Sequence, residues 1–215
     1  MMKGVLKFWR FFSPAFIIVF YFGLLGKFTG IWDITFPTNL KELVPTIPIL
    51  VLAVIYYALG IANLANKFWF SSVTENLRKR LVSASDLNDQ PNIFKWKEIR
   101  GVFYHLIDND KSLTTKGQLA HFNGLIWTTA ADSSLISAVF ICAALVMYLL
   151  GVPNTLFSAL FFFVICIISI MISWGTTLKH KSIGNQQVEI IEHLHKEKLT
   201  AKLKAIDKKF RNRSS

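Results

Sequence analysis

This sequence contains fewer charged residues than a soluble domain of its length would. Charged residues make up 17% of the 215 residues and hydrophobic residues 53%, whereas a typical soluble domain is about one quarter charged. No charged residue lies between Asp132 and Lys179. Because that window is longer than the buried helices of soluble proteins, the sequence indicates a membrane protein.

Cysteine and the usual catalytic groups are also sparse. The two cysteines, Cys142 and Cys166, lie in uncharged stretches, which excludes a disulfide scaffold. The interiors of the apolar stretches hold no Asp, Glu, Lys, Arg or His, and Asp132 stands at the cytoplasmic edge of one of them. We therefore expect neither proton-coupled transport nor an enzyme, and no catalytic residue, metal site or cofactor.

The apolar windows predict an all-α membrane protein with four transmembrane helices and helical cytoplasmic extensions. The first window begins at Phe11 and runs toward Trp32, and the second is Leu43 to Asn66. The window after Asp132 holds two helices joined by a turn at 151–154, Gly-Val-Pro-Asn. The expected segments are a leader (1–12), helices one and two (13–66), a cytoplasmic segment (67–131), helices three and four (132–178) and a basic tail (179–215).

The basic residues predict the orientation. Of the 24 Lys and Arg residues, only Lys27 and Lys41 lie in the connection between the first two spans, and none lies in the 151–154 turn. Since Lys and Arg accumulate on the cytoplasmic side, we expect a multi-pass protein of the inner membrane with both termini in the cytoplasm. The leader is either an interfacial helix that turns into the bilayer at Ser13-Pro14 or a frayed basic segment.

Apolar periodicity predicts helices outside the membrane as well. The second span continues into the cytoplasm with Val73, Leu77 and Leu81, a loop follows at 83–91, and another helix runs from near Asn92 to about Ile107. A third helix starts near Leu113, with an apolar stripe of Leu119, Phe122 and Ile126, and feeds into span three. In the tail, Leu199, Leu203, Ile206 and Phe210 recur at helical spacing, but Val188, Ile191 and Leu194 are out of phase with them.

Two short patterns suggest metal binding but fail on spacing. Residues 108–112, Asp-Asn-Asp-Lys-Ser, resemble the opening of a calcium loop, but Leu113 and Leu119 stand where Gly and Glu are required. We interpret this stretch as a turn with Asx capping. His193 and His195 are two residues apart on a helix and point away from one another, which prevents joint chelation.

Basic residues cluster in three runs that would face the cytoplasm. Topology and anionic lipids account for 78–80 (Arg-Lys-Arg) and for part of the tail. They account less well for Trp96 between Lys95 and Lys97, because cations beside an aromatic ring suit a ligand with a phosphate and a base. The predicted ligand-binding residues for a nucleotide or single-stranded oligonucleotide are Arg78, Lys79, Lys95, Trp96, Lys97 and Arg100. The alternative for Trp96, in line with Ile99 and Phe103, is a core position.

Small and polar residues mark the apolar spans. Asn63 and Asn66 lie near the inner end of span two, beside Ala and Gly residues that permit close helix packing. Ser137 and Ser169 belong to spans three and four. These four residues are candidates for a pore lining or for helix packing, and bonding of Ser to its own helix remains the alternative for the serines.

A bundle of four helices has little room for a conduit, so a pore requires several copies of the chain. The layout, with few spans and a basic helical cytoplasmic domain, resembles the small multi-span membrane effectors of bacterial anti-phage systems, such as the Hailong-type channel effector. The resemblance lies in layout and not in a motif. It implies a homo-oligomeric ion channel in antiviral defence that opens in response to an anionic ligand. The alternative is a non-conducting membrane adaptor or a scaffold that senses lipid or a partner.

Overall fold

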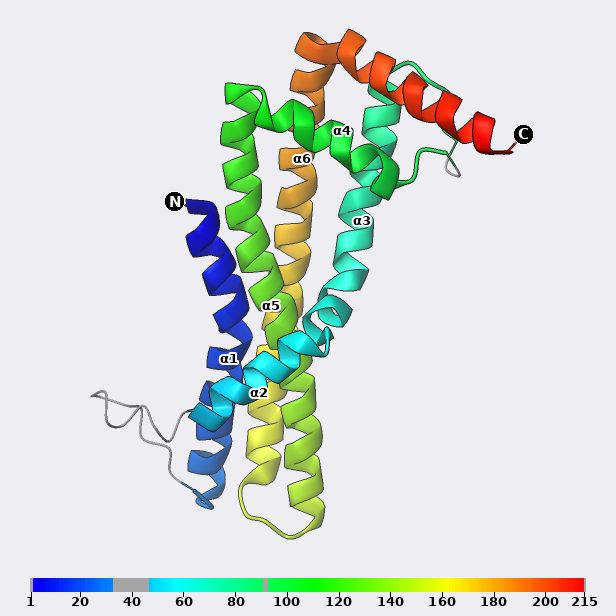
Figure 1. Cartoon of the computed structure of the whole chain (residues 1–215). Coiled ribbons are helices and arrows are strands. Elements are labelled where there is room, and N and C mark those ends of the chain that lie inside the picture. The colour runs from blue at the N-terminus through cyan, green and yellow to red at the C-terminus, as the bar shows by residue number, and fades with distance from the viewer. Residues whose placement is uncertain (1, 33–46, 91–92, 215) are drawn as a thin grey trace. The chain divides into compact units, whose positions relative to one another are not determined.

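The computed structural model describes residues 2–32, 47–90 and 93–214, and every regular element in these ranges is a helix (Figure 1). The chain divides into two compact units. The apolar unit comprises Met1–Phe68 and Leu125–Gly175, and the basic unit comprises Trp69–Gly124 and Thr176–Ser215. The helices are α1 (Met2–Thr29), α2 (Ile47–Ala58), α3 (Ile61–Ala84), α4 (Trp96–Asp108), α5 (Lys111–Leu149) and α6 (Thr155–Ser214).

Helix α1 runs without a break through Ser13-Pro14, the point at which the sequence suggested a change from leader to span. Proline has no N–H and leaves the carbonyl four residues earlier without its helical donor. The Ser13 hydroxyl donates to this carbonyl, that of Arg10, at 3.4 Å. The neighbouring side chain therefore offsets part of the cost of Pro14 inside the helix.

The second expected span, Leu43 to Asn66, is divided. Helix α2 ends at Ala58, and Gly60 has a positive φ of 70° before α3 begins at Ile61. A rise of 1.5 Å per residue makes α2 about 18 Å long, less than the roughly 30 Å of a hydrocarbon core. Residues 43–46 lie outside the described residues.

Three helices in the described ranges are long and apolar enough to cross a membrane: α1 from Gly4, α5, and α6 as far as Asn212. Of the four expected spans, three are present as continuous helices in the described residues, and the second is not clearly one. The sequence predicted a continuous second span because a count of apolar residues cannot show that one glycine, Gly60, takes a left-handed conformation and interrupts the helix.

The apolar unit is held together by α1, α2, α5 and α6. The turn between α5 and α6 lies where the sequence predicted it, and Gly151 and Asn154 take the left-handed conformations that close it, with φ of 79° and 59°. The core consists of Tyr21, Leu25, Tyr56, Ile136, Ala144, Ala159 and Phe162. Around it, most large apolar side chains of α6 between Leu156 and Trp174 are exposed, as lipid-facing or partner-facing residues would be.

The basic unit packs the later part of α3, all of α4, the start of α5 and the later part of α6. Val73, Leu77 and Leu81 are buried, as their four-residue spacing predicted. Helix α5 begins with the predicted Asx cap: Asp110 Oδ1 accepts from the backbone N–H groups of Ser112 at 2.8 Å and of Leu113 at 3.1 Å.

Helix α6 changes direction within the basic unit. His195 has φ −134° and ψ 16°, outside helical values, and Figure 1 shows the bend at the top of the orange ribbon. Val188 and Ile191 are buried before the bend, and Leu199 and Leu203 after it. Leu194, the third residue of the upstream apolar register, is 65% exposed, so the buried stripe does not include it.

Candidate anion-binding face

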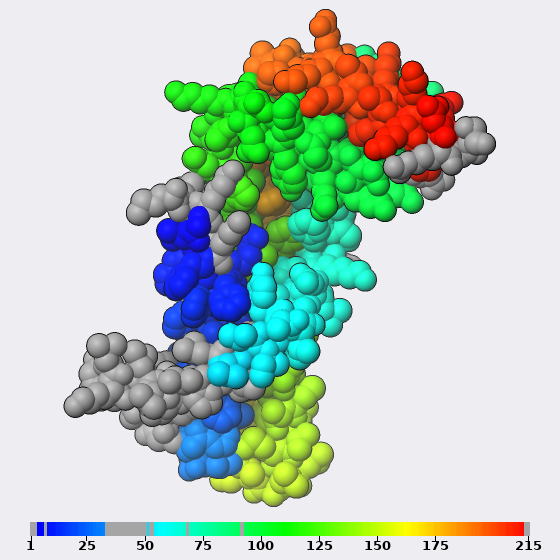
Figure 2. All heavy atoms as spheres, viewed as in Figure 1, coloured from blue at the N-terminus to red at the C-terminus, as the bar shows by residue number. Residues whose placement is uncertain are grey.

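The basic residues predicted to bind a ligand in the first turns of α4 lie on the exposed face of this helix. Ile99, Phe103, Leu106 and Ile107 are the buried residues of this helix and fix which side faces the core. Lys97 and Arg100 are exposed on the adjoining face. Green surface from this part of the basic unit is open to the viewer in Figure 2.

Trp96 combines the two roles that the sequence left open. Its side chain is half-buried, and its ring lies 5.8 Å from that of Phe103 and 6.5 Å from that of Tyr104, measured between centroids. Phe103 is buried, whereas Tyr104 is 50% exposed. The indole therefore packs onto the edge of the core and leaves part of its surface accessible.

Tyr104 belongs to the same face, although it is not among the residues that the sequence predicted for ligand binding. It lies four residues after Arg100, a spacing that places two side chains next to one another on a helix. Burial raises the pKa of Tyr104, and the nearby Arg100 guanidinium acts in the opposite direction. The i, i+4 relation to Arg100 was the signal that could have found it.

The cations of this face are weakly neutralised. The Lys97 ammonium lies 3.8 Å from a carboxylate oxygen of Glu98, and both side chains are largely exposed, so this pair contributes little. Within the described ranges, Lys95 and Arg100 form no ion pair. Two aromatic rings beside three exposed cations can stack a base and attract a phosphate.

Arg78 is placed differently from the other predicted ligand residues. It is 3% exposed, and its guanidinium donates to both carboxylate oxygens of Glu75 at 2.8 Å and to those of Asp89 at 2.6 and 3.0 Å. These hydrogen bonds hold the pKa of the Glu75 and Asp89 carboxyls below their usual values. We call this arrangement the Arg78 clasp. It joins α3 to the following loop, and the neighbouring Lys79 is exposed.

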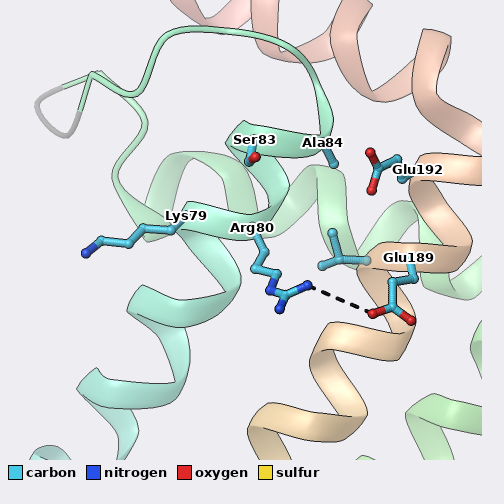
Figure 3. Close-up of a pocket in the computed structure, with 7 residues that line it drawn as sticks. Lys79, Arg80, Ser83, Ala84, Glu189 and Glu192 are labelled. Atoms are coloured by element: carbon cyan, nitrogen blue, oxygen red, sulfur yellow. Dashed lines mark ion pairs between the residues drawn. The ribbon is translucent and has the colours of Figure 1, made fainter.

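A hollow of about 270 Å³ lies beside Lys79 in the basic unit (Figure 3). Its lining has both signs of charge, and Arg80 lies 3.9 Å from Glu189 across it. Two carboxylates in the wall make it a poor site for an anion. The lining residues are Lys79, Arg80, Ser83, Ala84, Val188, Glu189 and Glu192.

The polar residues predicted for the spans divide into two groups. Asn63 is exposed, and Asn66 Nδ2 donates to the Ala62 carbonyl of its own helix at 2.7 Å. Ser137 and Ser169 are buried and belong to a hydroxyl network that connects three helices. Ser137 Oγ donates to the Tyr21 hydroxyl at 3.3 Å, and Ser169 Oγ lies 2.9 Å from Ser133 Oγ.

Tyr21 completes this network, because its hydroxyl also lies 2.8 Å from Ser133 Oγ. The network joins α1, α5 and α6 of the apolar unit by side-chain hydrogen bonds, which supports a packing role for Ser137 and Ser169. Its tyrosine was not among the predicted residues, because a tyrosine in a run of Phe and Leu is typical of ordinary apolar packing.

Asp132 is buried in the apolar unit, although it stands near one end of an apolar stretch. It is 2% exposed and accepts a hydrogen bond from the Tyr56 hydroxyl on α2, at 3.1 Å to Oδ1. Seventeen residues of α5 follow it, about 26 Å of helix, so it lies toward one end of the span. The sequence showed the carboxylate but not its partner, which is 76 residues away.

In the described part of the chain, no three His, Cys, Asp or Glu side chains come together in a group that would hold a metal ion. His195 has its Nε2 2.9 Å from Asp110 Oδ2. The Ser112 hydroxyl and this ring hold the pKa of the Asp110 carboxyl well below its usual range.

No protein-family model, no curated protein and no solved structure matches this chain.

Proposed function

We propose that the chain is a subunit of a homo-oligomeric membrane channel that opens when its basic unit binds an anionic nucleotide or oligonucleotide. The observation that carries the proposal is the continuity of α3, α5 and α6. Each runs as one element from residues of one unit into residues of the other, and α5 does so at 124–125. A change in the basic unit would thus act on two membrane-spanning candidates without an intervening flexible loop.

The α4 face supports the choice of ligand. It offers Lys95, Lys97 and Arg100 for phosphate, with Trp96 and Tyr104 for a base. The charge of the whole unit favours an anion too, since eight of the 24 Lys and Arg residues lie in 69–124 and ten in 176–215. Lys79 is a further exposed cation, whereas Arg78 serves the clasp.

Binding of the full-length protein to short single-stranded DNA and to cyclic nucleotides, across a salt series, tests the ligand. Lys97→Ala should weaken binding and flatten its salt dependence, because one phosphate contact is lost. Tyr104→Ala should weaken binding by about 1 to 3 kcal/mol with the salt slope nearly unchanged. Trp96→Ala should do the same and also lower stability, because its ring packs on Phe103.

Lys204→Ala is the matched control, an exposed cation on the tail segment of α6. If it weakens binding as much as Lys97→Ala, the attraction is diffuse and the α4 face is not the site. If the wild type binds neither class of ligand, the gating proposal fails.

The orientation we propose places the basic unit and both termini in the cytoplasm of a bacterial inner membrane. This requires a fourth crossing built from α2 and the first residues of α3, broken at Gly60. Single cysteines at His193 and Pro153, in a chain without Cys142 and Cys166, test it in intact cells. The first should react with an impermeant reagent only after permeabilisation and the second at once; the reverse pattern would overturn the orientation.

The alternative function is a non-conducting adaptor. It is favoured by Leu119 and Phe122 on the basic unit's part of α5, which are 52% and 56% exposed and offer an apolar surface to a partner.

A further inference from the structure

The apolar unit contains one carboxylate in its described residues, and its surroundings differ from those of the other acidic side chains. Asp132 is 2% exposed, whereas the Glu75 and Asp89 side chains of the Arg78 clasp are 50% and 41% exposed and pair with a guanidinium. An ionisable side chain within a membrane-spanning helix is costly and commonly serves function.

The groups that face Asp132 from other helices are few. Tyr56 of α2 donates its hydroxyl hydrogen to Oδ1, and Arg10 of α1 acts on the carboxylate electrostatically. No direct ion pair to Asp132 occurs among the described residues, and the Arg10 side chain is exposed. Helix α6 has no charged residue between Thr155 and Leu178.

Polar groups gather at the same level of the unit. Ser133, the next residue on α5, is hydrogen-bonded to Tyr21 on α1 and to Ser169 on α6. Hydroxyls of this kind both donate and accept, so they can exchange protons along hydrogen bonds. A carboxylate without a directly bound cation, held by a neutral phenol and placed beside hydroxyls, has the chemistry of a proton acceptor.

We propose that Asp132 is a proton-binding site of the apolar unit. The proton comes from water and forms the O–H bond on Oδ2, because Oδ1 already accepts the hydrogen of Tyr56. Protonation converts the carboxylate into a neutral acid, and release restores the charge near Arg10. Proton occupancy would then set the charge inside the unit, whichever ligand acts on the basic unit.

Infrared difference spectroscopy of the purified full-length chain in nanodiscs tests this directly, between about pH 4 and about pH 9. The C=O stretching band of a protonated carboxylic acid should rise as the pH falls. Asp132→Asn should abolish one such component. Glu197→Gln, the same change at an exposed position of the basic unit, should retain it.

Tyr56→Phe keeps the ring and removes the hydrogen bond to Oδ1, so it should shift the band to higher frequency. If size-exclusion chromatography shows that Asp132→Asn does not fold, Tyr56→Phe serves as the test instead. Identical spectra for the wild type and the folded Asp132→Asn would show that Asp132 does not bind a proton. If Asp132→Asn does not fold, a band that Tyr56→Phe leaves in place would overturn the proposal, because the protonated group would then not be the acid that Tyr56 contacts. The infrared measurement does not depend on conductance, so its result is independent of whether the protein forms a channel.

Discussion

Replacing Arg78 with methionine should destabilise the basic unit more than any change to the exposed basic residues around it. Methionine can occupy the buried space of the arginine stem, but it leaves Glu75 and Asp89 without the donor that both share. The loop after α3 then loses its polar attachment to that helix.

The expected loss of stability depends on how exposed the side chains of the clasp are. Removing one partner of a fully buried ion pair costs about 3 to 5 kcal/mol. Here the arginine side chain is 4% exposed, but the two carboxylates are 50% and 41% exposed and regain water when the arginine is lost. We therefore expect a loss of about 2 to 3 kcal/mol, below the range for a fully buried pair.

Thermal unfolding of the full-length protein in detergent, followed by circular dichroism, measures the change. Lys79→Met is the matched control, because Lys79 is the next residue, its side chain is 64% exposed, and its ammonium lies 3.9 Å from Glu75. Its effect should stay within about 0.5 kcal/mol. Equal effects of the two substitutions would refute the clasp.

The clasp also predicts a pH dependence. The folded pKa values of Glu75 and Asp89 lie below their ordinary values of 4.5 and 3.8. The folded state thus binds fewer protons, and the contribution of the clasp is complete above these ordinary values and is lost as the pH falls through the lower folded ones. Between neutral pH and about pH 3, the wild type should lose more stability than Arg78→Met.

Three further predictions concern packing and capping. Gly184→Ala should lower stability by about 1 kcal/mol, because the new methyl lies 2.6 Å from Leu77 Cδ2 and overpacking outweighs the gain in helix propensity. Gly101→Ala, with nothing within 4 Å of the new methyl, should raise stability by a similar amount. If thermal unfolding shows that both substitutions change stability in the same direction, the close contact between α3 and α6 is contradicted. Asp110→Ala should cost about 1 to 2 kcal/mol through loss of the α5 cap, and Asp110→Asn should recover most of it, since an amide oxygen also accepts from the backbone; equal losses would argue against the cap. Tyr21→Phe should cost about 1 kcal/mol in the same assay by removing the hydroxyl that joins Ser133 and Ser137, and no change would mean that the network does not stabilise the unit.

The parts of the fold that depend on local sequence could be predicted. The 151–154 turn follows from a Gly and Asn within a long uncharged window, and the Asx cap follows from an Asp two residues before Ser112.

Other features depend on residues that are distant in the chain or on one backbone angle. The break at Gly60 lies in an apolar run whose composition suits a continuous helix. The sequence predicted that Arg78 is available to a ligand, because its neighbours in the chain are basic. Its second partner, Asp89, lies 11 residues away, beyond the end of α3. Asp132 and Tyr56 meet only through tertiary packing. Within the candidate site, the sequence supplied the cations and Trp96, and packing added Tyr104.

Conductance of the purified full-length protein in planar bilayers tests the central proposal most directly. We expect discrete ionic currents that respond to the bound nucleotide or oligonucleotide, and a response that Lys97→Ala and Tyr104→Ala weaken while Lys204→Ala preserves it. A folded, membrane-inserted protein that passes no current with or without ligand would contradict the channel and leave the adaptor as the function.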